Sequence, residues 1–134
     1  MKTQKTEVRV RYDETDRMGV VYYGKYFTWL EVARTEFFRN LGMPYADLES
    51  EGIRLMVTKA SCAYKSPSTY DELLAIETSI KDVGNTSLAF SYVIFRKDTL
   101  IATAETVHVF TDQKGKPIRI PQKARKVLSA LTSE

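Results

Sequence analysis

The segment from residue 12 to residue 26 contains the residue types and the spacing that could perform chemistry. A half-buried strand is expected over 7–12, an acidic turn follows it, and a helix is expected from Gly24. Asp16 in that turn then precedes a helix N-terminus, where backbone N–H groups lack intrahelical partners. A carboxylate facing such donors can attack a carbonyl or activate water while the donors hold a developing oxyanion. The alternative is that Asp16 only binds the backbone of its own turn.

Two neighbouring features bear on Asp16. Gly19 fits a tight turn between Asp16 and the helix, because glycine adopts positive φ without steric cost. Asp13 and Glu14 are close enough in sequence to raise the pKa of Asp16 by like-charge repulsion, although we expect both to be solvated.

The remaining elements must position this turn. Apolar residues recur at steps of three and four over 24–41, which predicts a helix buried on most sides that ends at Gly42. A short helical turn is expected over 45–51, and alternating patterns predict strands over 54–65, 72–83, 86–96 and 100–110. A last helix is expected after Pro121. Short turns between the strands predict an α+β domain over 1–134, with a helix on an antiparallel sheet.

Composition excludes several classes of function. The chain has 134 residues with 43% hydrophobic and 28% charged residues, and no apolar run approaches the ~18 residues of a membrane span. The N-terminus lacks a secretory signal and Cys62 is the only cysteine, so we expect a cytoplasmic protein. The net charge of +3 permits an anionic small molecule and does not demand nucleic acid. No metal-ligand spacing or cofactor motif is present, so we expect no cofactor.

The turn also resembles a known family signature. Asp16, Gly19, Val21 and Tyr22 form an Asp-x-x-Gly-x-Val-Tyr pattern, and the likeness continues through Tyr26 and the segment Glu31-Val32-Ala33-Arg34. This pattern resembles hotdog-fold acyl-CoA thioesterases of the 4-hydroxybenzoyl-CoA thioesterase type. The resemblance implies a long buried helix wrapped by an antiparallel sheet of about five strands. It also implies hydrolysis of an acyl-CoA to a free carboxylic acid and CoA.

The resemblance assigns roles within the turn. It makes Asp16 the catalytic nucleophile or general base and the backbone N–H of Tyr23 the donor that polarises the thioester carbonyl. Many relatives active on short-chain acyl-CoA have histidine where this chain has Tyr23, so the acyl preference stays open. The resemblance further implies a homodimer with joined sheets and active sites at the subunit boundary, and it leaves a tetramer open.

Basic residues are needed for the phosphates of CoA. Arg96 and Lys97 follow the strand expected over 86–96 and resemble the basic pair found there in related thioesterases. Arg119 is a further candidate, and solvated turn charges are the alternative for all three.

Three other residues could carry chemistry. Glu31 lies on the long helix, where other hotdog lineages place a catalytic acid; the alternative is an ion pair with Arg34, Arg39 or Lys25. His108 is the only histidine and is expected to be structural or exposed, and Cys62 is expected to be a small strand residue. The rival functions are a hotdog dehydratase or hydratase acting on a hydroxyacyl thioester, and a non-catalytic acyl-thioester binding protein.

Overall fold

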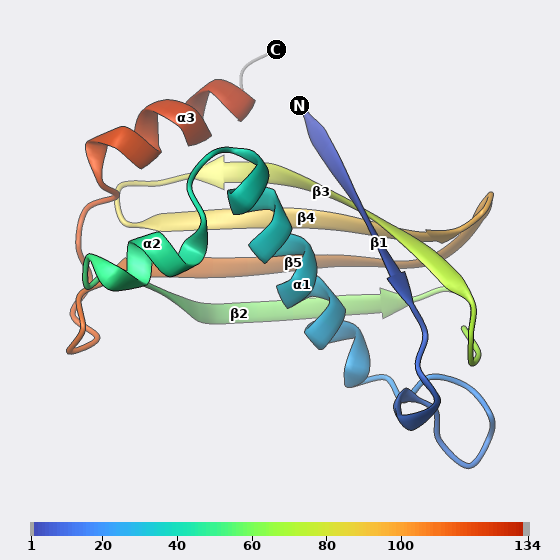
Figure 1. Cartoon of the computed structure of the whole chain (residues 1–134). Coiled ribbons are helices and arrows are strands. Elements are labelled where there is room, and N and C mark those ends of the chain that lie inside the picture. The colour runs from blue at the N-terminus through green and yellow to red at the C-terminus, as the bar shows by residue number, and fades with distance from the viewer. Residues whose placement is uncertain (1, 133–134) are drawn as a thin grey trace.

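The computed structural model describes residues 2–132, which form a sheet, one long helix and two shorter helices (Figure 1). The elements in chain order are β1 (Thr3–Arg9), a 3₁₀ turn (Tyr12–Glu14), α1 (Lys25–Asn40), α2 (Tyr45–Ser50), β2 (Arg54–Tyr64), β3 (Leu73–Val83), β4 (Ser87–Arg96), β5 (Thr99–Thr111) and α3 (Gln122–Thr132). These bounds confirm the expected order of elements.

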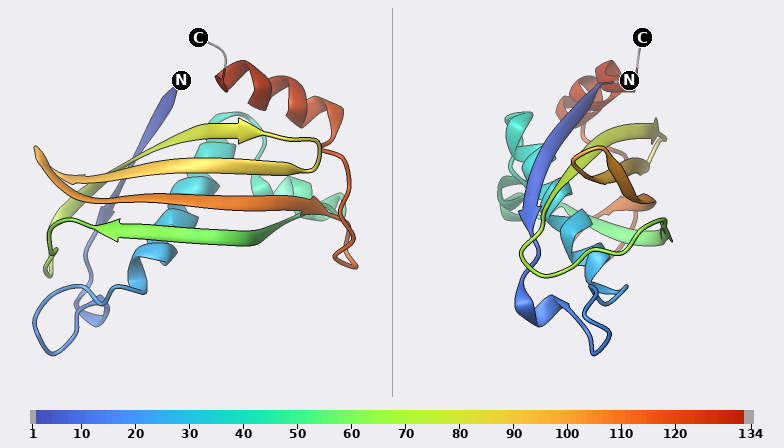
Figure 2. Two further views of the ribbon diagram at one scale, coloured as in Figure 1. Left: turned by 180° about the vertical axis from the view of Figure 1, so that it is seen from behind. Right: turned by 90° about the vertical axis from the view of Figure 1, so that its right-hand side faces the viewer.

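The sheet has five antiparallel strands in the order β1-β3-β4-β5-β2, so β1 and β2 form its two edges. Register shifts interrupt the pairing of β2 with β5, of β3 with β4, and of β4 with β5. Such bulges bend and twist a sheet. The helix α1 lies against one face of this sheet, and β1 crosses in front of the neighbouring strands (Figures 1 and 2).

The core lies between α1 and the sheet. Alternate residues of β3, β4 and β5 are buried on the helix side, including Leu74, Ile76, Ile80, Leu88, Phe90, Tyr92, Ile94, Ala102 and Phe110. The helix contributes Trp29, Leu30, Ala33, Phe37 and Phe38, as its three- and four-residue spacing predicts. This contact fixes the start of α1, and with it the acidic turn, relative to the ends of the strands.

One side of α1 remains exposed in the single chain. Thr28 and Glu31 are exposed, and Val32 keeps 39% of its surface accessible. The expectation that most of the circumference is covered was therefore too strong, because the sheet packs against one side of the helix only.

The first strand also differs from expectation. It was expected over 7–12 but begins earlier, at Thr3, and ends at Arg9, because Tyr12–Glu14 form the 3₁₀ turn. Val10 still joins the neighbouring segment: its N–H donates to the Glu72 carbonyl at 2.9 Å, and its carbonyl accepts the Asp71 N–H at 2.9 Å.

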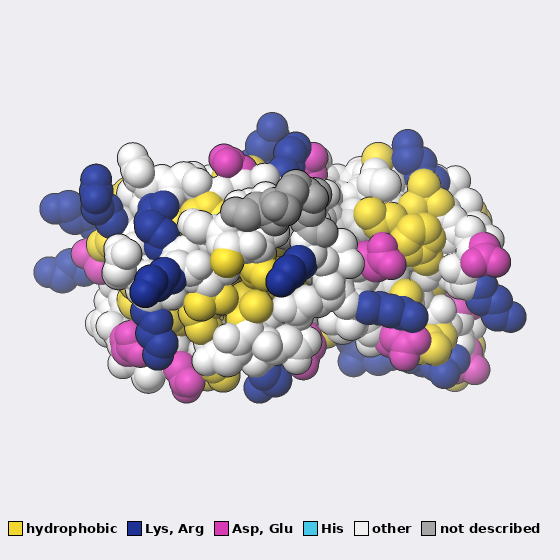
Figure 3. All heavy atoms as spheres, turned by 90° about the horizontal axis from the view of Figure 1, so that it is seen from above, with side chains coloured by type: hydrophobic (Ala, Val, Ile, Leu, Met, Phe, Trp, Pro, Cys, Tyr) yellow, Lys and Arg dark blue, Asp and Glu magenta, His cyan; other side chains and the backbone are white. Residues whose placement is uncertain are grey.

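Within residues 2–132, none of the helices combines the length and the apolar character needed to cross a bilayer. Viewed from above, acidic side chains lie among the basic ones around the margin of the molecule (Figure 3).

Candidate active site

A short closed loop holds Asp16. Its N–H donates to the Val20 carbonyl at 2.9 Å, its carbonyl accepts the Gly19 N–H at 3.0 Å, and Thr15 pairs with Val21 in an isolated antiparallel bridge. Gly19 has φ of +81°, as expected of a tight turn that only glycine enters without strain.

The Asp16 carboxylate uses one of its oxygens in this loop. Oδ1 accepts the Met18 N–H at 2.8 Å, so the turn-binding role is present. Oδ2 has no hydrogen-bond partner among the residues that the structure describes. Asp16 therefore stabilises its own turn and still presents a second oxygen for chemistry.

The Tyr23 amide is free where the helix begins. Gly24 is the N-cap residue and α1 starts at Lys25. The Tyr23 carbonyl accepts the Tyr64 hydroxyl at 2.9 Å and the Tyr26 N–H at 3.3 Å, whereas the Tyr23 N–H donates to no atom of residues 2–132. An unpaired N–H at a helix start is the donor that an oxyanion requires.

Asp16 and Tyr23 line the same cleft. It has a volume of about 360 Å³, and its other lining residues are Met18, Val20, Val21, Tyr26, Tyr64, Lys65, Ser66 and Pro67. Most of this lining is apolar or aromatic, which favours an acyl group. The cleft thus combines a carboxylate oxygen with an unpaired amide beside apolar walls.

Glu14 is not solvated, contrary to expectation. Its side chain is only 3% exposed; Oε1 accepts the Arg11 N–H at 2.7 Å, and Oε2 accepts the Trp29 Nε1–H at 2.9 Å. The Glu14 carbonyl also accepts the Tyr22 N–H at 2.9 Å. The hydrogen bond between Glu14 and Trp29 therefore connects the loop to α1. No local pattern in the sequence predicted this role.

Ser68 provides a second attachment for the loop. This residue is fully buried, its carbonyl accepts the Val21 N–H at 2.8 Å, and its hydroxyl pairs with the Tyr26 hydroxyl at 2.8 Å. Sequence reasoning missed Ser68, as it missed Tyr64 and Lys65 in the cleft wall. All three lie at or beyond the end of β2, and only tertiary pairing brings that end to the loop.

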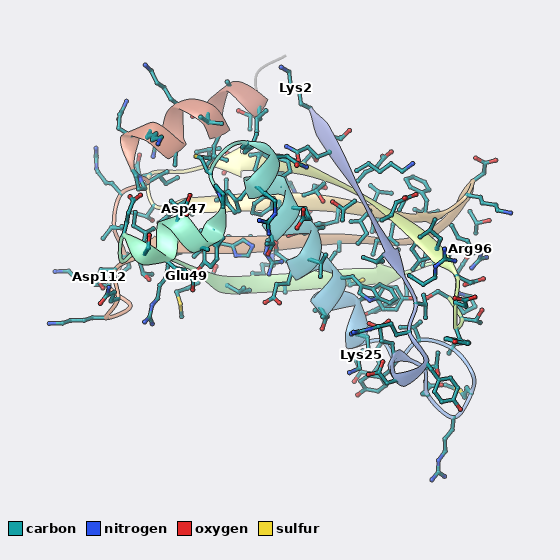
Figure 4. All side chains as sticks on the ribbon, viewed as in Figure 1. Lys2, Lys25, Asp47, Glu49, Arg96 and Asp112 are labelled. Carbon is teal, nitrogen blue, oxygen red and sulfur yellow. The ribbon has the colours of Figure 1, made fainter. Side chains whose placement is uncertain are left out.

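The basic pair expected to bind phosphates borders the cleft. The Arg96 guanidinium donates to the Pro67 carbonyl at 3.0 Å, and Pro67 lines the cleft. Arg96 also pairs with Glu72 at 3.2 Å. A neighbouring cavity of about 460 Å³ is lined by Lys5, Glu7, Arg9, Glu72, Leu73, Ala75, Arg96 and Lys97. Figure 4 shows Arg96 at the same end of the molecule as Lys25, which begins α1.

The single chain does not bring Arg119 to this end. The adjacent Ile118 and Ile120 N–H groups donate to the carbonyls of Phe110 and Asn85. Asn85 precedes β4 whereas Arg96 ends it, and the strand is about 30 Å long at roughly 3.3 Å per residue. Arg119 therefore lies at the opposite end of the sheet from Asp16.

Glu31 and His108 lie away from the cleft. Both line a cavity between α1 and β2, which they share with Arg34 and five further residues. Within residues 2–132, no basic side chain pairs with Glu31, so the alternative of an ion pair with Arg34, Arg39 or Lys25 was wrong. Arg34 donates instead to the Tyr92 hydroxyl at 3.2 Å.

His108 should make the stability of the protein depend on pH. Burial, with a smaller contribution from the Arg34 charge, lowers the pKa of His108 from 6.5 to about 4. Between these values the unfolded chain binds the proton and the folded chain does not, so stability falls as pH falls from about 6.5 to about 4. At roughly 1.4 kcal/mol per pH unit, the loss approaches about 3 kcal/mol.

Urea unfolding of the wild type and of His108→Gln at pH 7 and pH 4 measures this contribution. The difference in unfolding free energy between the two proteins should shrink on acidification, because titration of the shared carboxylates cancels in it. A difference that does not change with pH would contradict the assignment.

Metal binding has no support from the side-chain arrangement. Across residues 2–132, no group of three or more His, Cys, Asp or Glu side chains is placed to hold a metal ion.

Comparison with known proteins places the chain in a family. The model of the thioesterase-like superfamily matches residues 10–128. The chain is 36% identical over 121 residues to the putative acyl-CoA thioesterase YneP of Bacillus subtilis, covering 89% of this chain and 88% of that protein. It is also 36% identical over 117 residues to the acyl-CoA thioester hydrolase YbgC of Escherichia coli, covering 86% and 87%.

A solved structure agrees with these relatives. DHNA-CoA thioesterase from Staphylococcus aureus superposes with a TM-score of 0.94 at 35% identity, covering 97% of this chain and 91% of that one. The helix and five-stranded antiparallel sheet are thus those of the hotdog thioesterases, as the resemblance implied. The chain belongs to the thioesterase-like superfamily.

Proposed function

We propose that this protein is a cytoplasmic acyl-CoA thioesterase that uses Asp16 and the Tyr23 backbone N–H. The observation that carries the proposal is one cleft lined by both Asp16 and Tyr23, whose carboxylate Oδ2 and backbone N–H have no hydrogen-bond partner among residues 2–132. The names of the relatives, acyl-CoA thioesterase and thioester hydrolase, support the same activity.

The proposed reaction adds water across the thioester bond. The carbonyl oxygen accepts the Tyr23 N–H, which stabilises the negative charge that develops on that oxygen. Asp16 either deprotonates the attacking water or attacks the carbonyl carbon itself and forms a mixed anhydride that water then opens. In both routes the C–S bond breaks, CoA leaves as the thiolate and takes up a proton, and the acyl group leaves as a carboxylic acid.

We propose that basic side chains near Arg96 bind the phosphates of CoA. Arg96, Lys97, Lys5 and Arg9 line one cavity beside the cleft, and Lys65 lies in the cleft wall. Arginine and lysine side chains bind phosphate through charge-assisted hydrogen bonds. Arg119 could join them only from a second copy of the chain.

Two copies are proposed to pair along β2. This edge strand is exposed along most of its length, and Met56, Val57 and Tyr64 keep 47%, 53% and 42% of their surfaces accessible. A long exposed edge strand with apolar side chains favours pairing with another strand. Antiparallel pairing about a twofold axis would place the partner subunit's Arg119 toward the Asp16 end of the first chain. Whether such dimers form tetramers stays open.

The burial of His108 weakens the dehydratase alternative. Hotdog relatives of that class perform the chemistry with a histidine near the turn and helix, whereas His108 is 1% exposed and lines a different cavity. A purely binding role would not need the free Asp16 oxygen and the Tyr23 amide in one cleft.

Release of free thiol from a panel of acyl-CoAs, followed with a chromogenic thiol reagent, tests the proposal. Thiol release in step with free acid is the expected result, with benzoyl-type, short-chain and long-chain substrates defining the acyl preference. Hydration of an enoyl substrate without thiol release would favour the dehydratase instead. Binding without any turnover would favour the non-catalytic role.

A further inference from the structure

Tyr64, the last residue of β2, is bonded to the segment just before α1. Its hydroxyl donates to the Tyr23 carbonyl at 2.9 Å, although the two residues are 41 positions apart in the sequence. A carbonyl oxygen can only accept, so the proton of this bond belongs to Tyr64. The end of β2 and the start of α1 lie at the same end of the molecule (Figures 1 and 2). The bond therefore connects the sheet to the residue whose N–H is the proposed oxyanion donor.

The Tyr23 carbonyl has a second, longer hydrogen bond. The Tyr26 N–H donates to it at 3.3 Å, beyond the roughly 3.2 Å at which N–H···O bonds are well formed. Gly24, the N-cap residue of α1, has no side chain that could bind the start of the helix. The Tyr64 hydroxyl is therefore the shorter contact to this carbonyl, and it comes from outside the helix.

The unpaired N–H belongs to the neighbouring peptide, between Tyr22 and Tyr23. The carbonyl of this peptide accepts the Lys25 N–H at 2.9 Å, and the Tyr22 N–H donates to the Glu14 carbonyl at 2.9 Å. Two soft dihedral angles at Tyr23 join this peptide to the one that Tyr64 binds. The direction of the Tyr23 N–H thus depends on hydrogen bonds on both sides of the Tyr23 Cα, and Tyr64 supplies one of them.

The ring of Tyr64 is held by other aromatic rings. Its centroid lies 5.0 Å from that of Tyr26 at 80° and 6.3 Å from that of Tyr23 at 82°, both edge-to-face arrangements. Tyr26 is 3% exposed, and its hydroxyl pairs with Ser68 at 2.8 Å. These contacts restrict rotation of the Tyr64 ring, which lowers the entropic cost of keeping its hydroxyl on the Tyr23 carbonyl.

Tyr64 keeps its proton at neutral pH. Partial burial, followed by the nearby Cys62, Tyr26 and Tyr23 side chains, raises the pKa of Tyr64 above its ordinary value of 10.0. The hydroxyl therefore remains a donor through the neutral and mildly alkaline range, and it should not act as a base.

We propose that Tyr64 is a positioning residue for thioester hydrolysis, whose hydroxyl orients the Tyr23 N–H toward the thioester carbonyl. This inference rests on the proposed function. An oxyanion donor acts only if it points at the developing charge, and a misplacement of about 1 Å can cost about 10²-fold in rate. Tyr64 acts through Tyr23 and not on the substrate, because its single hydroxyl proton is already used.

Tyr64→Phe removes the hydroxyl and keeps the ring. Its kcat should fall by about 10- to 100-fold, up to the effect of losing one oxyanion donor. KM should stay within about twofold, because the lost contact acts in the transition state and the cleft walls are unchanged. Steady-state thiol release, with the acyl-CoA that the wild type hydrolyses fastest, measures both constants.

Tyr45→Phe is the matched control. The Tyr45 hydroxyl accepts the Leu55 N–H at 3.0 Å near the other end of β2, and Tyr45 does not line the cleft. Its kcat should stay within about twofold of the wild type. Circular dichroism and urea unfolding should show both variants folded, and a loss of activity through general destabilisation would appear in both.

Two further measurements separate positioning from a merely structural role. In NMR spectra of the free protein, the Tyr23 carbonyl carbon and the Gly24 amide nitrogen belong to the peptide that loses the bond. Both resonances should move in Tyr64→Phe, together with that of the Tyr23 amide, and should stay in place in Tyr45→Phe. Replacement of Tyr64 by 4-aminophenylalanine, whose NH₂ group can donate from the same position, should restore most of kcat.

Several results would overturn the proposal. An unchanged kcat in Tyr64→Phe would do so and leave the thioesterase activity intact, and so would equal losses in Tyr64→Phe and Tyr45→Phe. A raised KM with unchanged kcat would make Tyr64 a substrate contact instead. Absence of thiol release by the wild type from every acyl-CoA would refute the proposed function, and this inference with it.

A second pair of variants decides if Tyr64→Phe fails to fold. Replacement of Tyr64 by 4-fluorophenylalanine fills the space of the hydroxyl without a donor, whereas 4-aminophenylalanine fills it with one. The fluoro variant should lose kcat and the amino variant should keep it. Equal activities of the two would contradict the positioning role.

Discussion

Replacing Asp16 with asparagine should lower kcat for acyl-CoA hydrolysis by about 10²–10⁴, the usual contribution of a positioned general base or nucleophile. The amide oxygen can still accept the Met18 N–H that Oδ1 accepts at 2.8 Å, so the loop should keep its conformation. The Asp16→Asn variant should therefore bind substrate with little change in affinity and fail in the chemical step. Steady-state thiol release, with far-UV circular dichroism to verify the fold, measures both effects.

Asp13→Asn is the matched control for this experiment. Its side chain belongs to the same acidic turn but is 79% exposed and does not line the cleft. Its activity should stay within about twofold of the wild type, as expected for a solvated surface charge. If Asp16→Asn lost less than about tenfold in kcat while remaining folded, the catalytic assignment of Asp16 would fail.

Glu14→Gln should destabilise the folded protein strongly for a change that replaces one oxygen with an NH₂ group. The buried carboxylate accepts from the Arg11 N–H and the Trp29 Nε1–H, one at each oxygen. A glutamine amide has one oxygen, so its NH₂ group must face one of these two donors. Loss of a charged hydrogen bond together with an unsatisfied buried donor should lower the unfolding free energy by about 2–3 kcal/mol.

Urea denaturation compares this variant with Glu36→Gln. Glu36 pairs with Arg39 three residues later on the surface of α1, and its side chain is 39% exposed. The same chemical change there should cost less than about 0.5 kcal/mol, because surface ion pairs contribute little. Equal stabilities of the two variants would show that the Glu14 contacts contribute nothing beyond a surface pair.

The sequence predicted the elements well where periodicity is strong. The alternation in β4 and β5 and the helical spacing of α1 follow directly from which side chains face the core. The end of β1 was misplaced because Val8, Val10 and Tyr12 continue the alternation past Arg9, whereas the 3₁₀ turn takes over at Tyr12. Alternation alone does not reveal where a strand leaves its neighbour.

The candidate site was predictable only in part. Asp16, Gly19 and Tyr23 belong to one contiguous segment, so a local motif contains all three. Ser68 and Tyr64 lie more than 40 residues after this segment in the sequence. Arg34 of α1 and His108 of β5 line one cavity although they are also far apart in the sequence. No local sequence pattern predicts these contacts, because they depend on strand pairing and on how α1 lies across the sheet.

Trp29 can report on the loop that holds Asp16 by its fluorescence. It is the only tryptophan in the chain, it is 3% exposed, and its indole N–H donates to the Glu14 carboxylate beneath the loop. Indole emission is sensitive to this hydrogen bond and to the entry of water. Fluorescence of the unlabelled protein can therefore follow opening of the loop separately from circular dichroism, which follows melting of the helices and the sheet.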